Sequence, residues 1–452
     1  MTPHKIDIHH IIDPFIERVD TRRVVLETQL LPRAAETLRQ SLPAGLWIVL
    51  SDANTHQVAG RAVEESLERD GLPFERVTLS PKPGEHDPIA DDDRIEELRL
   101  RLVEDPRPVA LVAVGAGTIN DVAKMACHKA NIPYAVVATA PSMNGYTSAI
   151  AAILSQGVKT TVPCRAPILC MADLDVMAQS PYRMIASGFG DLLSKPVSNA
   201  DWRLSHRLLD TVHSADTMAL VEQGFAFLEG VAPRLPLRDV DAVGRLTATL
   251  CISGMAMAVA GSSAPASGGE HLISHYIDMT HFAFGDPHDF HGCQVGVATI
   301  TTAALYEKLT ALDPDTIDIE TLIEEHLPLD QYEALTRSRF GPLSEAVIEH
   351  MRALYPTPDT LRQRLGLLKK EWASIIEDVN GSLKPARAIR DDLLAAHCPV
   401  TFEEINVAPE RARAAIVCSK DIRARYSILH LAFDLGLIDT WADEILNDLH
   451  GI

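Results

Sequence analysis

The 452-residue chain lacks several features that mark specialised classes of protein. Its seven cysteines are scattered without a C-x-x-C pair, which argues against zinc fingers and a disulfide framework and fits a reducing cytoplasm. No basic stretch followed by an apolar one opens the chain, so no signal peptide is expected. No apolar run approaches the ~20 residues of a membrane span. Basic residues form no run and the formal net charge is −21, which argues against nucleic acid as a partner.

What is present fits a globular protein of two or three domains, with 46% hydrophobic and 23% charged residues. Residues 1–40 are predicted to form a helical or irregular leader. Residues 41–180 alternate apolar strands with amphipathic helices, which predicts an α/β domain with a parallel doubly wound sheet. Residues 181–452 have helical periodicity and predict an all-helical domain.

The stretch VAVGAGTIND, residues 112–121, follows a predicted strand and opens a predicted helix. Gly115 and Gly117 allow close approach of a ligand to the backbone, and a helix N-terminus offers free N–H groups to a phosphate. A tight turn without a ligand explains the same residues. The stretch departs from the dinucleotide pattern G-x-G-x-x-G at Asn120, and it is no P-loop because no G-K-[ST] follows.

Polar residues follow two further strands. Asp52 comes directly after the first strand, where an acid can bind a ribose diol or can simply cap the next helix. The segment VATAPSMNGYTSA, residues 137–149, leaves another strand at the edge where open α/β sheets bind ligands. Thr139, Ser142 and Ser148 supply hydroxyl groups there, although a plain polar loop is the alternative.

One aspartate and several histidines lie in three glycine-flanked segments. SGFGDLLSK carries Asp191, and SGGEHLISH carries His271 and His275, which share one helix face because they are four residues apart. GDPHDFHGCQVG carries His288 and His291. The protease motif H-E-x-x-H is absent, since Leu272 follows the first histidine of the pair. One aspartate with two or three histidines could form a three-ligand zinc or iron site with an open position.

GAGTINDVAK, ATAPSMNGYTS, GFGDLLSK, GGEHLISH and HGCQVG occur in the order and approximate spacing of the sn-glycerol-1-phosphate dehydrogenases. The chain resembles the bacterial branch of this family, within the superfamily of iron-containing alcohol dehydrogenases and dehydroquinate synthase-like proteins. The resemblance runs from about Leu46 to the C-terminus.

The resemblance implies an active site in the cleft between the two domains. It implies that Asp191, His271 and His291 hold the catalytic metal, with Asp191 and His275 as catalytic residues that also face the substrate. It further implies NAD or NADP as cofactor and one divalent metal, with zinc favoured over nickel or iron. The implied cofactor contacts are Asp52 at the adenosine ribose, Gly115, Ala116, Gly117, Thr118, Ile119 and Asn120 at the pyrophosphate, and Thr139, Ser142 and Ser148 beside the nicotinamide.

The implied activity is interconversion of sn-glycerol 1-phosphate and dihydroxyacetone phosphate by a cytoplasmic homo-oligomer. Three alternatives stay open at this point: a related polyol- or keto-phosphate dehydrogenase, a sugar-phosphate cyclase on the same fold, and a catalytically silent homologue that keeps NAD and metal. One departure bears on the choice. Asn144 stands where the family pattern A-P-S-M-D-G has aspartate. We expect residue 144 to contact the substrate, and Asn144→Asp to raise kcat/KM if the substrate is the family's.

Overall fold

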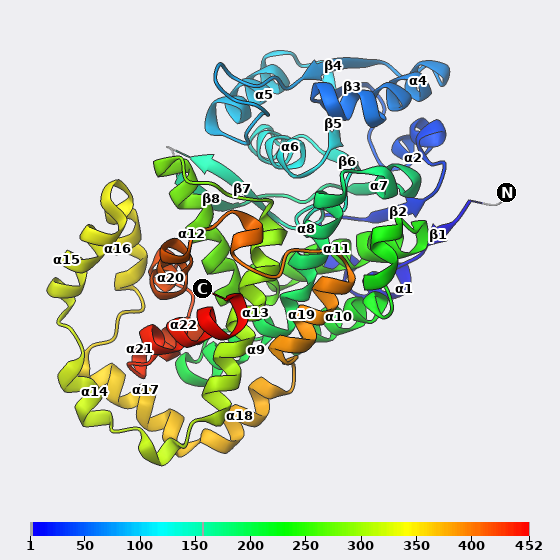
Figure 1. The fold of residues 1–452 in the computed structure, drawn as a ribbon. Coiled ribbons are helices and arrows are strands. Elements are labelled where there is room, and N and C mark those ends of the chain that lie inside the picture. The colour runs from blue at the N-terminus through cyan, green and yellow to red at the C-terminus, as the bar shows by residue number, and fades with distance from the viewer. Residues whose placement is uncertain (1–2, 156–157, 452) are drawn as a thin grey trace. The chain divides into compact units, whose positions relative to one another are not determined.

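The computed structural model describes residues 3–155 and 158–451 of the chain. It divides into two compact units, each described below by itself. Figure 1 labels their helices and strands. Unit 1 comprises Met1–Leu192 and Asp216–Ser263. Unit 2 comprises Leu193–Ala215 and Ala264–Ile452.

Unit 1 is built on a seven-stranded sheet in the order β1-β2-β9-β6-β5-β3-β4. The strands are β1 (Lys5–Ile6), β2 (Arg23–Glu27), β3 (Leu46–Ser51), β4 (Phe74–Thr78), β5 (Pro108–Gly115), β6 (Tyr134–Ala138) and β9 (Leu169–Asp173). All neighbours pair in parallel except β1 with β2. A two-stranded antiparallel ribbon, β7 (Ile150–Ser155) with β8 (Val158–Pro163), stands apart from the sheet. The predicted parallel α/β fold is confirmed.

The strands are apolar along nearly their whole length because both faces of the sheet are covered. Alternate residues such as Val49, Val112 and Val137 form one core with the helices that follow β2 and β3. Their neighbours in sequence, such as Leu50 and Ala113, point to the other face and are equally buried. The helices of unit 1 are α1 (His9–Ile12), α2 (Ala34–Arg39), α3 (Ala53–Thr55), α4 (Arg61–Arg69), α5 (Asp92–Glu104), α6 (Gly117–Ala130), α7 (Leu174–Gln179), α8 (Tyr182–Leu193), α10 (Ala215–Phe225) and α11 (Val240–Ala260).

Among its described residues, unit 2 contains helices and connecting loops and no strand. Its helices are α9 (Lys195–Leu209), α12 (Gly269–Phe284), α13 (His291–Ala311), α14 (Ile319–Glu325), α15 (Leu329–Phe340), α16 (Ser344–Arg352), α17 (Pro358–Lys370), α18 (Trp372–Asn380), α19 (Ala386–Ala395), α20 (Pro409–Cys418), α21 (Ile428–Asp434) and α22 (Ile438–Ile445). α13 packs against α9, α12, α19, α21 and α22. Small and apolar residues surround its axis, which suits a helix buried on all sides.

The boundaries of the units differ from those predicted. Residues 1–40, the expected leader, contain β2, which lies inside the sheet. β2 pairs in parallel with β9, and β9 pairs on its other side with β6. The boundary predicted near residue 180 is not a single point in the chain. The chain passes from unit 1 to unit 2 after Leu192, returns to unit 1 at Asp216 with α10 and α11, and passes to unit 2 again at Ala264. Helical periodicity identifies a helix but does not indicate which core the helix covers.

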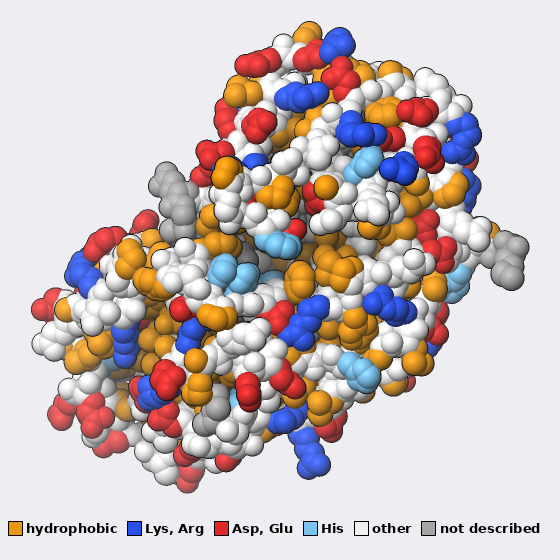
Figure 2. Space-filling model, turned by 45° about the horizontal axis from the view of Figure 1, so that its top comes forward, with side chains coloured by type: hydrophobic (Ala, Val, Ile, Leu, Met, Phe, Trp, Pro, Cys, Tyr) orange, Lys and Arg blue, Asp and Glu red, His pale blue; other side chains and the backbone are white. Residues whose placement is uncertain are grey.

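Two further expectations concern membranes and charge. Among the described residues, α11 alone is long and apolar enough to cross a membrane, and 83% of its apolar window is buried inside the protein. Such burial is typical of a core helix. On the face that the described residues form in Figure 2, acidic and basic side chains are interspersed and no basic patch is visible. All seven cysteines lie among the described residues, where each is buried and none forms a disulfide.

Candidate active site

The glycine turn of unit 1 lies where the sequence placed it, between β5 and α6. Ala116 is the N-cap of α6, in extended conformation and with no side-chain capping bond. The first bond within the helix runs from the Asn120 N–H to the Ala116 carbonyl at 3.0 Å. The N–H groups of Gly117, Thr118 and Ile119 therefore precede the helical ladder and are available to an anion.

Two of the predicted cofactor contacts have structural partners of their own. Asp52 caps α3, since its Oδ1 accepts the Thr55 N–H at 2.7 Å and the Thr55 hydroxyl accepts the Asp52 N–H at 3.0 Å. The Asn120 side chain is fully buried, and its Oδ1 accepts a hydrogen bond from the Tyr134 hydroxyl. The backbone at the start of α6, rather than the Asn120 side chain, is thus suited to a phosphate. A ribose contact of Asp52 stays a prediction.

A buried lysine, Lys124, which was not predicted from the sequence, forms hydrogen bonds to the Thr139–Ser148 segment that follows β6. The Lys124 ammonium donates to the carbonyls of Gly145 and Ile150 at 2.7 and 2.8 Å, and to the Ser148 hydroxyl at 3.2 Å. Ser148 is itself fully buried, and so supports the loop from inside. Thr139 and Ser142 lie at the start of the segment with small exposed fractions.

Two glycines let helices press against the same segment. A Cβ on Gly188 of α8 would lie 1.8 Å from the Pro141 carbonyl oxygen, and one on Gly254 of α11 would lie 2.3 Å from the Thr147 hydroxyl. Any side chain at either position would force the segment away. The glycine-rich sequence before Asp191 is therefore needed for close packing, which brings Asp191 to residue 144.

Asn144 cradles the carboxylate of Asp191. Its backbone N–H donates to Oδ2 at 3.0 Å, and its side-chain Nδ2 donates to Oδ1 at 3.1 Å. Nδ2 also lies 3.5 Å from the Ser253 hydroxyl. Asp191 is fully buried, so these two charge-assisted bonds offset the cost of burying its charge. The departure from the family pattern thus has a partner within the protein, which the sequence could not reveal.

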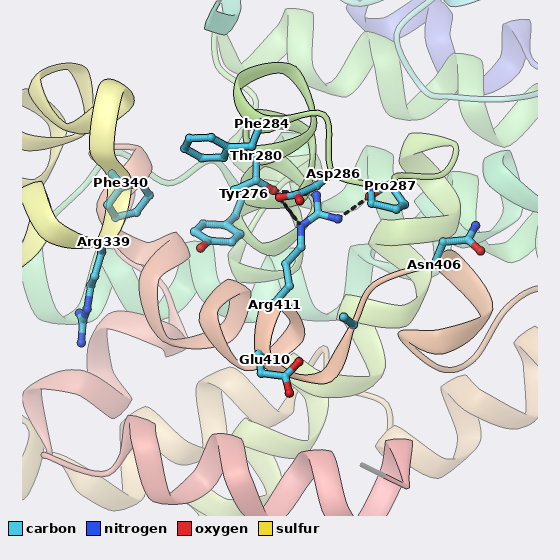
Figure 3. A pocket seen from close by; sticks show the side chains of 11 residues that line it. Tyr276, Thr280, Phe284, Asp286, Pro287, Arg339, Phe340, Asn406, Glu410 and Arg411 are labelled. Carbon is cyan, nitrogen blue, oxygen red and sulfur yellow. Dashed lines mark hydrogen bonds and ion pairs between the residues drawn. The ribbon is translucent and has the colours of Figure 1, made fainter.

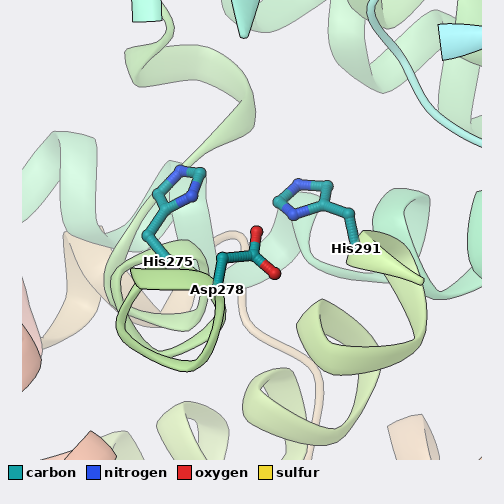
Figure 4. A group of neighbouring side chains, drawn as sticks. All are labelled: His275, Asp278 and His291. Atoms are coloured by element: carbon teal, nitrogen blue, oxygen red, sulfur yellow. The ribbon is translucent and has the colours of Figure 1, made fainter. Parts of the chain in front are cut away.

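Unit 2 gathers histidines from α12 and the start of α13. One ligand atom each of His275, Asp278 and His291 lie within 4.8 Å of one another. Figure 4 shows the two imidazoles on either side of the Asp278 carboxylate, His275 and Asp278 from one helix and His291 from the next. The His271 ring is 5.2 Å from the His291 ring, centroid to centroid. Asp278 was missed, although it follows His271 by seven residues and His275 by three on the same helix face.

The His271 ring is oriented by its neighbour in sequence. Glu270 is fully buried, and its Oε1 lies 2.7 Å from Nδ1 of His271 and accepts the Gly268 N–H at the same distance. A carboxylate on Nδ1 fixes that proton and leaves Nε2 with its lone pair. Behind this pair, burial raises the pKa of Asp201 from 3.8 to about 7, and the nearby Glu270 carboxylate adds to the rise.

Another face of α12 borders a hollow of about 420 Å³ in unit 2, lined in part by Tyr276, Thr280 and Arg411 (Figure 3). Arg411 of α20 donates to the Thr280 hydroxyl at 2.9 Å and to the Ile277 carbonyl at 2.6 Å, both on α12. It also donates to the carbonyl of Pro287, in the loop that leads to His291. Arg411 therefore ties that loop to α12. His288, in the same loop, stacks on His281.

Known proteins are similar to this chain in sequence and in fold. The family model of iron-containing alcohol dehydrogenases matches residues 25–181. A protein of Halalkalibacterium halodurans named glycerol-1-phosphate dehydrogenase is 32% identical over 346 residues, covering 76% of this chain and 80% of that protein. Its namesake from Bacillus subtilis is 35% identical, covering 59% of this chain and 67% of the relative.

The chain belongs to the glycerol-1-phosphate dehydrogenase family. Solved structures agree on the fold. A probable glycerol dehydrogenase from Sinorhizobium meliloti superposes with a TM-score of 0.60 at 15% identity, covering 94% of this chain and 98% of that one. Glycerol dehydrogenase from Schizosaccharomyces pombe gives a TM-score of 0.59 at 16% identity, with coverage of 94% and 91%. At these identities the likeness concerns the fold alone.

The donor groups of this member of the glycerol-1-phosphate dehydrogenase family fit a divalent metal. Imidazole nitrogens and carboxylate oxygens are the ligands that zinc and iron take in catalytic sites. Orientation of His271 by Glu270 is the usual support of such a ligand. The ligand set Asp191, His271 and His291 stays a prediction, and Asp278 and His275 are the further groups that the structure adds around His291.

Proposed function

We propose that the protein is an NAD(P)-dependent, metal-dependent dehydrogenase that interconverts sn-glycerol 1-phosphate and dihydroxyacetone phosphate. The observation that carries the proposal is the cluster of oriented histidines on α12 and α13 in a chain of this family. The relatives' name supplies the substrate and the cofactor class, NAD(P)+.

In this proposal Asp191, His271 and His291 hold the metal. The bound metal supplies Lewis acidity toward the oxygen at the reacting carbon. Glu270 keeps the His271 lone pair directed outward, and Asn144 holds the Asp191 carboxylate in its orientation. Zinc is the metal we favour, and elemental analysis of the purified protein distinguishes it from nickel and iron.

The cofactor is assigned to unit 1. The pyrophosphate would lie at the start of α6, where three N–H groups precede the helical ladder, and Asp52 would accept hydrogen bonds from the adenosine ribose. Thr139 and Ser142 would border the nicotinamide. The role of Lys124 and Ser148 is to hold this segment in place from within. Hydride transfer itself is the chemistry of the nicotinamide.

His275 is assigned to the substrate. It lies one helical turn after His271 on α12, so it reaches the space beside the ligands. As a neutral imidazole it could donate a hydrogen bond to the substrate oxygen, or accept its proton when the alcohol is oxidised. Replacing His275 by asparagine should lower kcat and leave the metal content unchanged. If the metal content of this variant fell as far as its kcat, His275 would be a metal ligand instead.

The test is NADH oxidation with dihydroxyacetone phosphate, beside dihydroxyacetone and a small panel of other keto-phosphates. The proposal predicts turnover of dihydroxyacetone phosphate well above that of the unphosphorylated ketone. Activity on another keto-phosphate alone would change the substrate while keeping the cofactor and metal. Absence of any NADH oxidation by a metal-loaded protein would support a cyclase or a silent homologue. We also expect a homo-oligomer, which size-exclusion chromatography with light scattering checks.

A further inference from the structure

Behind His291 lies a chain of buried hydrogen bonds that involves a motif residue with no assigned role, Gln294 in HGCQVG. Its Nε2 lies 3.0 Å from Oδ1 of Asp278 and 2.6 Å from the carbonyl oxygen of Asp289. Its Oε1 accepts a hydrogen bond from the Ser274 hydroxyl at 3.3 Å. The same hydroxyl lies 3.1 Å from Nδ1 of His291. Gln294 and Ser274 are both fully buried.

The two ends of the Gln294 amide can be told apart by their neighbours. A carboxylate oxygen and a backbone carbonyl only accept hydrogen bonds here, so the group that faces both of them must be the NH₂. The amide oxygen then faces Ser274 and needs a donor. Leaving a buried acceptor without one is costly, so the single Ser274 proton points to Gln294.

This arrangement decides the proton position on His291. Because the Ser274 proton is used toward Gln294, its oxygen can only accept from Nδ1 of His291. The ring must then carry its proton on Nδ1, which leaves the lone pair of Nε2 for a ligand bond. Asp278 thus sets the orientation of the Gln294 amide, Gln294 sets the direction of the Ser274 proton, and Ser274 sets the tautomer of the His291 imidazole.

We propose that Gln294 and Ser274 are positioning residues that set the tautomer and orientation of His291 for metal binding through Nε2. This inference rests on the proposed function only in requiring a metal at His291, and not on the substrate. His271 is oriented directly by the Glu270 carboxylate, whereas His291 is oriented by the neutral pair Ser274 and Gln294, called the relay below. Two differently supported histidines would thus complete one metal site.

The experiment measures metal affinity of the full-length protein by competition of zinc with a chelator. We expect Ser274→Ala and Gln294→Met each to weaken zinc binding by about 10–100-fold, the range found for groups that orient ligands. The control is Thr299→Val, which removes a buried hydroxyl of α13 whose one partner among the described residues is the Val295 carbonyl of its own helix. Its zinc affinity should equal that of the parent protein.

The double variant Ser274→Ala with Gln294→Met distinguishes a relay from general damage. Members of one relay should couple, so the double variant should lose less affinity than the product of the two single losses. Losses that multiply, or single variants with parental affinity, would overturn the inference. Nitrogen NMR of the zinc-loaded parent, labelled at histidine, provides a second test without a variant. A His291 signal with the proton on Nε2 and metal on Nδ1 would also overturn it.

These outcomes are separable from failure of the proposed function. If the two substitutions weaken zinc binding in a coupled way but the protein does not oxidise NADH, the inference about the relay stands and the proposed function is wrong. If the protein is active with dihydroxyacetone phosphate but both substitutions leave its zinc affinity unchanged, the proposed function stands and the inference about the relay is wrong. A parent protein that binds no divalent metal at all contradicts both.

Discussion

Asn144→Asp places a second carboxylate against Asp191. In the structure the Asn144 side chain donates to Oδ1 of Asp191 at 3.1 Å. An ionised aspartate has no proton to donate, so the substitution turns this hydrogen bond into a contact between two oxygens of like charge. The backbone bond from residue 144 to Oδ2, at 3.0 Å, survives the change. The structure therefore reverses the expectation from sequence that this substitution raises activity.

The magnitude follows from the two effects. Loss of one hydrogen bond to a buried charged group costs about 1.5–3 kcal/mol. Two unit charges about 3 Å apart repel by about 5 kcal/mol at an effective dielectric constant of about 20, and a bound divalent cation would offset part of this repulsion. We therefore expect kcat/KM with dihydroxyacetone phosphate to fall by up to roughly 10–150-fold, the range reached when the whole cost of the lost bond is also lost from the transition state.

The assay compares steady-state NADH oxidation and zinc content for three variants. Asn144→Leu removes the side-chain donor without adding charge, so its loss should be smaller than that of Asn144→Asp. Ser253→Ala removes only the long 3.5 Å contact and should remain close to the parent. A rise in kcat/KM for Asn144→Asp would refute the reasoning, because it would show that the substrate, and not Asp191, determines what residue 144 must be.

Four further predictions follow from the site. His291→Ala should lose most of its zinc by elemental analysis, and retention of full metal content would remove His291 from the ligand set. Glu270→Gln should weaken zinc binding by about 10–100-fold because the neutral amide holds His271 less firmly, and an unchanged chelator competition curve would contradict this role. Asp52 should make NAD(H) at least as good a cofactor as NADP(H), since a carboxylate repels a 2′-phosphate, and a large kcat/KM advantage of NADP(H) would disprove it. Because burial raises the pKa of Asp201 from 3.8 to about 7, its neutral form is favoured in the folded state, and its contribution to stability should decline as pH rises between these values. Urea unfolding across that range should show a decline that Asp201→Asn reduces, and identical pH profiles would show that Asp201 does not titrate there.

The fold class could be predicted because its signals are local. Short apolar runs that end in glycine or small polar residues, and that alternate with amphipathic helices, indicate strands of a parallel sheet. The strand Arg23–Glu27 gave no such signal, since it is five residues long and pairs with Leu169–Asp173, far away in the sequence. Its place in the sheet depends on that distant partner. The same holds for α10 and α11, whose helical pattern is independent of the core they join.

The candidate site was predictable as a set of segments and much less so as a set of contacts. The glycine-flanked motifs located Asp191 and the histidines, and the helical repeat could have added Asp278. The roles of Lys124 and Gln294 depend on hydrogen-bond partners from other segments, which no local pattern encodes. Likewise, Asn144 was recognised as a departure, while its partner Asp191 became visible only through the close approach at Gly188 and Gly254.

The central claim is that metal held by these histidines enables NAD(P)H to reduce dihydroxyacetone phosphate. The most direct measurement is NADH oxidation with dihydroxyacetone phosphate by the purified protein before chelation, after chelation and after return of one equivalent of zinc per chain. The account predicts activity that disappears with the metal and returns with it, and no recovery in the His291→Ala variant. Undiminished activity in the fully chelated protein, or no activity in a protein shown to hold both zinc and NADH, would contradict it.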